Sequence, residues 1–258
     1  MRYPTFNFAI VRKPGENFCD GLTTVDLGAP DYNKSLEQHG EYCNALKKCG
    51  LKLTILEADP RYPDGAFVDD TAVITDECLV QSSFTFPSRQ GEGRAVKDFL
   101  PKRNRLERIP KPATMEGGDI LRVSEHFFIG LSKRTGEEGA KRLGEILEKY
   151  GYSWSTVPVT KVLHLSTGAT WIGGNNVVAT SELAEHLKKY DWLNVIATPE
   201  DERYAANCLF INGAIIMPAG FPKTKELIRK ITDANIIEVE MSEFEKMDGG
   251  LTCLSLRF

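Results

Sequence analysis

The chain has 258 residues, of which 41% are hydrophobic and 26% are charged, and this composition is typical of a globular protein rather than a disordered or collagen-like one. The 36 acidic and 32 basic side chains give a formal net charge of −4, and no basic block could neutralise a phosphate backbone, so we expect no nucleic-acid partner. The longest uncharged run, residues 204–222, is broken by polar residues and two prolines, and we therefore expect no membrane-spanning helix.

Two further features concern the cellular location and the thiols. Residues 1–6 lack the apolar core and the small-residue cleavage site of a secretory signal, so we expect a cytoplasmic protein. The six cysteines are scattered and include no C-x-x-C pair, which argues against a disulfide scaffold or a zinc site and leaves thiols that could act as nucleophiles. At this length, one α/β domain over residues 1–258 is the default expectation.

The first predicted elements are a strand, a helix and a second strand. Apolar residues 6–12 form the first strand-like run. A helix that ends at Gly50 follows, and one of its faces carries Leu36, Cys43, Leu46 and Cys49. The run 51–56 is the second strand.

Four β-hairpins are predicted further along the chain. The clearest signal is Asn212–Gly213 between two apolar runs, a dipeptide typical of a tight two-residue turn. Paired apolar runs predict the hairpins 71–75/78–80, 120–123/127–129, 170–172/177–179 and 208–211/214–217. Helices then follow at 93–100, 139–150, 181–189 and 223–231, and strands at 106–109, 156–159, 193–197 and 236–239.

These units repeat along the chain. The hairpins begin near residues 71, 119, 170 and 207, at spacings of 48, 51 and 37 residues, and the run 251–258 could pair with the run 6–12. Five strand-strand-helix-strand units of this size predict a radial array that closes on itself. A doubly wound sheet is the competing architecture, but it would not place a hairpin before every helix, and no G-x-G-x-x-G opens a helix.

Polar residues interrupt the chain at equivalent places, just before or inside the hairpins and the final run: Asp69, Asp70, Glu116, Asp119, His164 and Cys253. In a radial array, the equivalent ends of the units converge on one axis, so these side chains would meet at a single site. Each has an ordinary structural interpretation as well. Cys253 taken alone is more often a small core side chain, and His164 a histidine bonded to the backbone.

The sequence resembles the dimethylarginine dimethylaminohydrolases, within the guanidine-modifying amidinotransferase and arginine deiminase superfamily. The resemblance rests on the segments 20–23, 63–70, 87–89, 116–120, 130–135, 164–165, 205–208 and 248–256, in this order. It implies a five-bladed α/β propeller of ββαβ units with pseudo-fivefold symmetry, the pentein fold. This architecture agrees with the repeats.

A protonated guanidinium is a poor electrophile, and attack on its carbon needs a soft charged nucleophile and a proton for the departing amine. The resemblance implies that Cys253 attacks this carbon, that His164 protonates the amine and then activates water, and that Glu116 orients His164. Citrulline would be the product, without a metal or other cofactor. The resemblance also implies which residues bind the substrate, a guanidino amino acid. Asp70, with Asp69 beside it in sequence, would bind the guanidinium, and Arg89 and Arg134 the carboxylate. Leu22, Asp64 and Met247 would lie near the ammonium group.

The chain departs from the family pattern at three places. Asp69 replaces a glutamate, the segment 81–86 replaces an Arg-Pro-Gly stretch, and Ser166 replaces a lysine. Deiminases that resemble this family carry an aspartate at the position of Ser166, so we expect methylated arginines to be preferred to arginine. An arginine deiminase and a non-catalytic guanidine-binding protein are the alternatives, and a homodimer is the oligomeric state to test.

Overall fold

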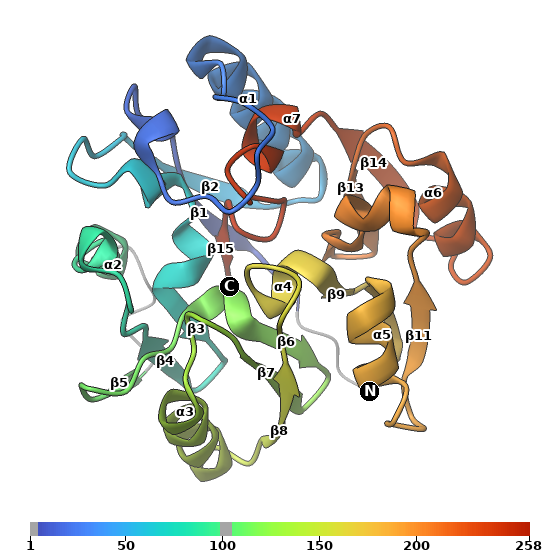
Figure 1. Ribbon diagram of the computed structural model, residues 1–258. Coiled ribbons are helices and arrows are strands. Elements are labelled where there is room, and N and C mark those ends of the chain that lie inside the picture. The colour runs from blue at the N-terminus through green and yellow to red at the C-terminus, as the bar shows by residue number, and fades with distance from the viewer. Residues whose placement is uncertain (1–4, 99–104) are drawn as a thin grey trace.

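A computed structural model describes residues 5–98 and 105–258. Within these residues, five three-stranded sheets surround one axis like the blades of a propeller (Figure 1). The fold is therefore the predicted five-bladed α/β propeller of repeated ββαβ units.

Each blade has the same strand order. An antiparallel pair supplies the inner and middle strands, and the outer strand runs parallel to the middle one. From the inside outward, the blades are β15 (Leu256–Arg257), β1 (Phe8–Arg12) and β2 (Lys52–Leu56); β3 (Ala72–Ile74), β4 (Cys78–Gln81) and β5 (Arg105–Arg108); β6 (Ile120–Val123), β7 (His126–Leu131) and β8 (Ser153–Pro158); β9 (Ala169–Trp171), β10 (Asn176–Ala179) and β11 (Asn194–Ala197); and β12 (Leu209–Ile211), β13 (Ala214–Pro218) and β14 (Asn235–Val239).

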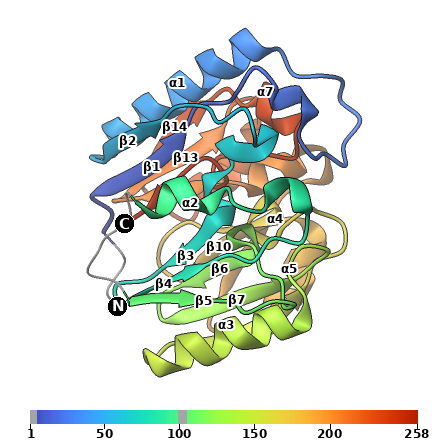
Figure 2. The same ribbon diagram turned by 90° about the vertical axis from the view of Figure 1, so that its left-hand side faces the viewer.

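Within the described residues, each blade has one α-helix between its middle and its outer strand. These helices are α1 (Tyr32–Lys48), α2 (Gly93–Lys97), α3 (Glu137–Lys149), α5 (Ser181–Leu187) and α6 (Pro222–Arg229). The side chain of Asp31 caps α1 by accepting a hydrogen bond from the Lys34 backbone N–H at 2.8 Å. Figure 2 shows α1 and α3 along opposite outer sides of the molecule, so the helices cover the blades and leave the axis to strands and turns.

Short-range signals predicted these elements well. Asn212 and Gly213 both have positive φ, 49° and 88°, as a two-residue hairpin turn requires. The predicted helix at 93–100 is shorter, since α2 ends at Lys97, and residues 99–100 lie outside the described part of the chain. In the predicted run 251–258, only Leu256–Arg257 is a strand, because residues 251–254 form a turn.

The ring encloses a central cavity of about 180 Å³, lined by residues of all five inner strands. The blades are closed into a ring by β15, which pairs with β1 and so joins the two ends of the chain in one sheet. Among the described residues, no helix combines the length and the apolar character needed to cross a membrane.

Candidate active site

Five short turns precede the five inner strands. They are the 3₁₀ turns Val68–Thr71, Gly117–Asp119 and Glu200–Ala206, the helical turn α4 (Leu165–Gly168) and the turn at 250–254. The turn Gly117–Asp119 contacts both Val68–Thr71 and α4, and α4 also contacts Glu200–Ala206. The symmetry of the ring thus gathers the polar residues that the sequence places at the ends of successive units.

A small cavity of about 10 Å³ lies among these turns. Eight of the ten predicted site residues line it: Leu22, Asp64, Asp70, Arg89, Arg134, His164, Met247 and Cys253. The volume is about that of one water probe, so the site must widen before it can hold an amino acid. A cavity of about 540 Å³ lies beside it, and Leu163 and Asp248 line both.

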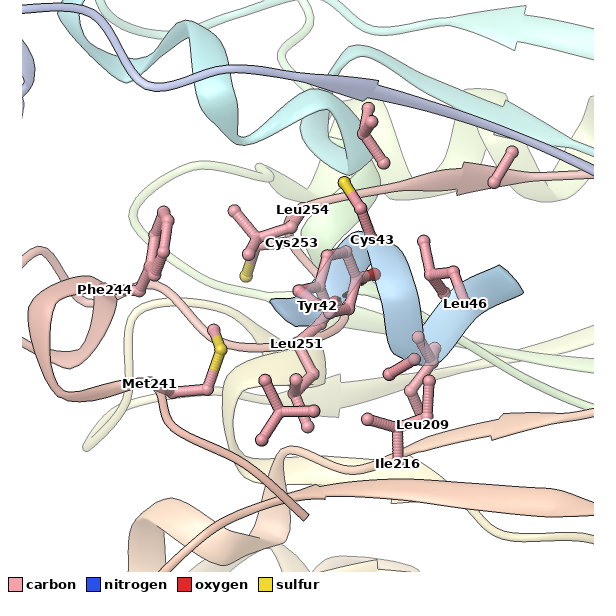
Figure 3. Close-up of a cluster of buried hydrophobic side chains, with 14 of the residues drawn as sticks. Tyr42, Cys43, Leu46, Leu209, Ile216, Met241, Phe244, Leu251, Cys253 and Leu254 are labelled. Carbon is pink, nitrogen blue, oxygen red and sulfur yellow. Dashed lines mark hydrogen bonds between the residues drawn. The ribbon is translucent and has the colours of Figure 1, made fainter. Parts of the chain in front are cut away.

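Cys253 lies in the turn before β15, with 4% of its surface exposed. Figure 3 shows it within an apolar cluster that includes Leu251, Leu254 and Phe244. Burial, followed by the charge of Asp70, raises the pKa of the thiol from 9.0 to about 12. Cys253 is therefore a neutral thiol at physiological pH.

His164 is the residue directly before α4, and it is 1% exposed. Its Nε2 lies 3.0 Å from Glu116 Oε2, and its Nδ1 lies 3.8 Å from Asp70 Oδ1. Burial disfavours the charged ring, but Asp70, Asp119 and Glu116 outweigh burial and raise the pKa of His164 from 6.5 to about 9. The imidazolium is thus the resting form at neutral pH, ready to donate a proton.

Arg89 and Arg134 differ in how many of their guanidinium N–H donors have hydrogen-bond partners. Arg89 donates Nε and Nη2 to the two Glu92 oxygens at 3.0 and 2.8 Å, and Nη1 to Asp70 Oδ2 at 2.7 Å. Arg134 stacks on the Phe86 ring, 4.3 Å from its centroid. Its Nη1 lies 3.7 Å from a Glu116 oxygen but has no hydrogen-bond partner within the described residues. Arg134 therefore offers the donor that an incoming carboxylate can use.

Two predicted site residues do not line the small cavity. Glu116 is fully buried behind His164, and its Oε1 has no hydrogen-bond partner in the described part of the chain. Asp69 faces the central cavity instead, where its Oδ1 accepts a hydrogen bond from Arg257 Nη2 at 3.1 Å. The structure thus separates the adjacent acids, with Asp70 on the side of Cys253 and Asp69 on the opposite side.

The segment around Leu22 closes one side of the small cavity. The Leu22 N–H donates to Asp64 Oδ1 at 3.0 Å. Asp248, directly after Met247, accepts hydrogen bonds from Thr24 Oγ1 at 2.9 Å and Thr23 Oγ1 at 3.2 Å. These contacts hold residues 22–24 against Met247, and all of the residues 23–29 are exposed.

Gly118 allows the acidic and histidine turns to meet. Its backbone N–H donates to Asp70 Oδ1 at 3.1 Å. A Cβ at this position would lie 2.4 Å from that oxygen and 2.9 Å from two atoms of the His164 ring. A glycine is therefore required for the contact between these two side chains.

The sequence analysis gave no role to Glu92, and it placed Asp119 among the converging polar residues without assigning it a function. Glu92 holds Arg89, and its i, i+3 spacing from Arg89 was the available signal. Asp119 accepts hydrogen bonds from the Leu165 N–H at 3.0 Å and from Ser132 Oγ at 2.7 Å, and thereby holds the turn that follows His164. Ser132 and Leu165 lie 13 and 46 residues from Asp119, so no local pattern shows the contacts of Asp119.

Asp70, Glu116 and His164 have ligand atoms within 4.8 Å of one another, a spacing that a metal ion could use. However, guanidinium nitrogens of Arg89 and Arg134 already lie 3.6 and 3.7 Å from Glu116 Oε2. These two guanidinium groups repel a divalent metal ion from the Glu116 carboxylate. This donor set therefore suits an organic cation and proton transfer better than a metal.

Known proteins resemble this chain over nearly its whole length. Residues 30–255 match the family model described as N,N dimethylarginine dimethylhydrolase, eukaryotic. The N(G),N(G)-dimethylarginine dimethylaminohydrolase of Pseudomonas aeruginosa is 44% identical over 257 residues, which cover 98% of this chain and 100% of that protein.

Two solved structures show the same likeness. One is a cysteine-to-serine variant of the Pseudomonas aeruginosa enzyme in complex with citrulline, with a TM-score of 0.92 and 43% identity over 98% of this chain and 100% of that one. The other is a histidine-to-glycine variant of a dimethylarginine dimethylaminohydrolase as an adduct with S-methyl-L-thiocitrulline, with the same TM-score, identity and coverage.

Proposed function

Because the chain belongs to the dimethylarginine dimethylaminohydrolase family, we propose that it hydrolyses Nω-methylated L-arginine to L-citrulline and dimethylamine or methylamine. It is then a hydrolase of the C–N bonds of linear amidines. The observation that carries this proposal is the cavity in which Cys253, His164 and Asp70 meet. A thiol, a protonated imidazole and a carboxylate are the three groups that guanidine hydrolysis requires.

Recognition begins with two charged ends of the substrate. Asp70 lines the small cavity together with Cys253 and binds the guanidinium there through charge-assisted hydrogen bonds. At the other end, the unpaired donor of Arg134 binds the α-carboxylate, with Arg89 beside it. Asp64 and the backbone at Leu22 and Met247 surround the α-ammonium group.

The bound cation activates the nucleophile. A guanidinium next to Cys253 offsets the charge of Asp70, which lowers the pKa of the thiol, and its proton leaves to solvent. The Cys253 sulfur then bonds to the guanidino carbon. Because Glu116 holds Nε2 of His164, Nδ1 gives its proton to the departing methylated nitrogen, and the C–N bond breaks.

Hydrolysis of the covalent thiouronium intermediate regenerates the enzyme. His164 is now neutral and takes a proton from a water molecule, whose oxygen attacks the former guanidino carbon. The C–S bond breaks, citrulline leaves and Cys253 returns as a thiol after taking up a proton. Glu116 stabilises the imidazolium at both ends of the cycle through the 3.0 Å contact.

Ser166 supports a preference for methylated substrates. It offers no second carboxylate, so the unmethylated guanidinium of arginine would leave N–H donors poorly paired. Ser166 also lines the central cavity rather than the small one, and its Oγ accepts a hydrogen bond from Thr252 Oγ1 at 3.3 Å. A methylated nitrogen has fewer donors to satisfy and gains from apolar contact.

Three further proposals concern the whole protein. We regard residues 1–258 as one catalytic domain, a view supported by the pairing of β1 with β15. The six cysteines are all unpaired, which supports a reducing compartment such as the cytoplasm. A homodimer stays a prediction, and sedimentation equilibrium tests it.

A substrate panel tests the function. Asymmetric dimethylarginine, monomethylarginine, arginine and agmatine are compared by kcat/KM, with citrulline, alkylamine and ammonia measured separately. We expect dimethylamine and citrulline in equal amounts from dimethylarginine, and slow turnover of arginine. A tenfold preference for arginine with ammonia release would instead show an arginine deiminase, and binding without turnover would show a non-catalytic guanidine-binding protein.

A further inference from the structure

Arg257 lies on β15, and its guanidinium spans the turn that carries Cys253. Nη1 donates to the backbone oxygens of Thr252 and Ser255 at 3.1 and 2.7 Å, and to Ser255 Oγ at 2.9 Å. Nη2 donates to Asp69 Oδ1 at 3.1 Å. One planar side chain thus joins both sides of the nucleophile turn to the acidic turn of another blade.

Asp69 completes this connection through its backbone. Its N–H donates to the Cys253 carbonyl oxygen at 3.1 Å. Asp69 therefore contacts Cys253 through the main chain and Arg257 through the side chain. The side chains of Asp69 and Arg257 are 14% and 15% exposed, so water competes only partly for their ion pair.

The two cavities show on which side of the turn this ion pair lies. Asp69, Thr252 and Arg257 line the central cavity, whereas Asp70 and Cys253 line the small cavity. In each of the two turns, consecutive residues thus face different cavities, so the turns form the wall between the central and the small cavity. Arg257 therefore does not line the cavity that holds the Cys253 side chain.

We propose that Arg257 and Asp69 form a clamp that sets the position of the Cys253 sulfur relative to Asp70 and His164, and that Arg257 is a positioning residue for the reaction. This inference rests on the proposed role of Cys253 as the nucleophile. The clamp links the turn of Cys253 to the turn of Asp70, and a shift of about 1 Å between reacting groups can cost about 100-fold in rate.

A second set of contacts holds the opposite side of the same turn. The Thr252 N–H donates to Asn207 Oδ1 at 3.0 Å, and Asn207 Nδ2 donates to the Ser166 backbone oxygen at 2.9 Å. This side ties the nucleophile turn to the turn that follows His164. We therefore expect the turn to keep its fold without the clamp, and its placement against Asp70 to relax.

The test compares Arg257→Gln, Arg257→Lys and Asp69→Asn with Arg122→Gln as the matched control. Arg122 also lines the central cavity but donates to the Ser124 backbone oxygen at 2.8 Å rather than to the nucleophile turn. With dimethylarginine as substrate, we expect Arg257→Gln to lower kcat by about 10- to 100-fold while KM changes less than about threefold. Arg257→Lys should recover part of kcat, and Arg122→Gln should match the wild type.

A measurement that does not depend on substrate turnover tests the clamp independently of the proposed function. Alkylation of Cys253 by iodoacetamide, followed by peptide mass spectrometry, should be about tenfold faster in Arg257→Gln than in the wild type, because the turn opens more often. If the wild type turns over no guanidine, the proposed function is refuted, and the alkylation rates still show whether the clamp exists. The clamp is overturned if Arg257→Gln and Asp69→Asn keep wild-type kcat and alkylation rates, or if Arg122→Gln shows the same losses. Should Arg257→Gln not fold, Arg257→Lys and Asp69→Asn decide by the same two measurements.

Discussion

Replacing Glu116 by glutamine tests what keeps His164 protonated. The substitution keeps the shape of the side chain but removes the negative charge 3.0 Å from His164 Nε2. A hydrogen bond to a charged group contributes about 1.5–3 kcal/mol, which corresponds to about 1–2 pH units. The pKa of His164, about 9 in the wild type, should therefore fall by that amount, to about 7–8 in Glu116→Gln.

The same shift predicts a change in stability with pH. The folded protein raises the pKa of His164 from 6.5 to about 9, so this group stabilises the fold fully below pH 6.5 and loses its effect as the pH rises through 9. Between pH 6 and 9, the wild type should lose about 3 kcal/mol of unfolding free energy from His164, and Glu116→Gln only about 1 kcal/mol.

Urea unfolding at the two pH values measures these losses. Subtracting the loss of a His164→Gln variant removes the contribution of all other titrating groups. An NMR titration of the His164 ring gives the pKa directly. If the wild type and Glu116→Gln lose the same free energy and titrate at the same pH, Glu116 makes no contribution to the raised pKa of His164 beside those of Asp70 and Asp119.

Three other predictions follow from the site. Because burial raises the pKa of Cys253 to about 12, its alkylation in the free enzyme should be slower than that of the exposed Cys19 and should still rise above pH 10; a plateau near pH 8 would contradict this. Arg134→Ala should lower kcat/KM for dimethylarginine by an amount that corresponds to a loss of about 2–5 kcal/mol in transition-state stabilisation. The wild type should use agmatine poorly, because agmatine lacks the carboxylate; efficient agmatine turnover would argue against a carboxylate-binding role of Arg134. Gly118→Ala should lower kcat by about 100-fold or more, whereas Gly136→Ala, whose Cβ would meet only Thr114 Oγ1 at 3.7 Å, should leave kcat unchanged; equal kcat values for the two variants would refute the close approach.

Local signals explain how much of the fold could be predicted. The turn at Asn212–Gly213 and the apolar stripe of α3 depend on residues a few positions apart, so the sequence shows them directly. The repeat of such units then predicts the ring. By contrast, the turn at 250–254 depends on distant partners: Tyr42 Oη donates to the Leu251 backbone oxygen at 2.9 Å, from 209 residues away. No periodicity in residues 251–258 reveals that contact, which explains why a longer strand was expected.

The candidate site shows the same division. The equivalent positions of Asp70, Glu116, His164 and Cys253 in successive units predicted that these residues meet, because ring symmetry converts a repeat in sequence into convergence in space. The orientation of Asp69 could not be predicted, since its side chain follows a partner, Arg257, that lies 188 residues away. Side-chain direction at the site depends on such long-range pairs.

Trapping the covalent intermediate tests the central claim, that Cys253 forms a bond to the guanidino carbon. The wild type is mixed with excess asymmetric dimethylarginine, quenched in acid within the first turnovers and digested, and the cysteine peptides are weighed. We expect a mass increase equal to the substrate minus dimethylamine on the peptide that contains Cys253, together with released dimethylamine. Citrulline formation without any adduct, or an adduct on Cys19 or another cysteine, would contradict it.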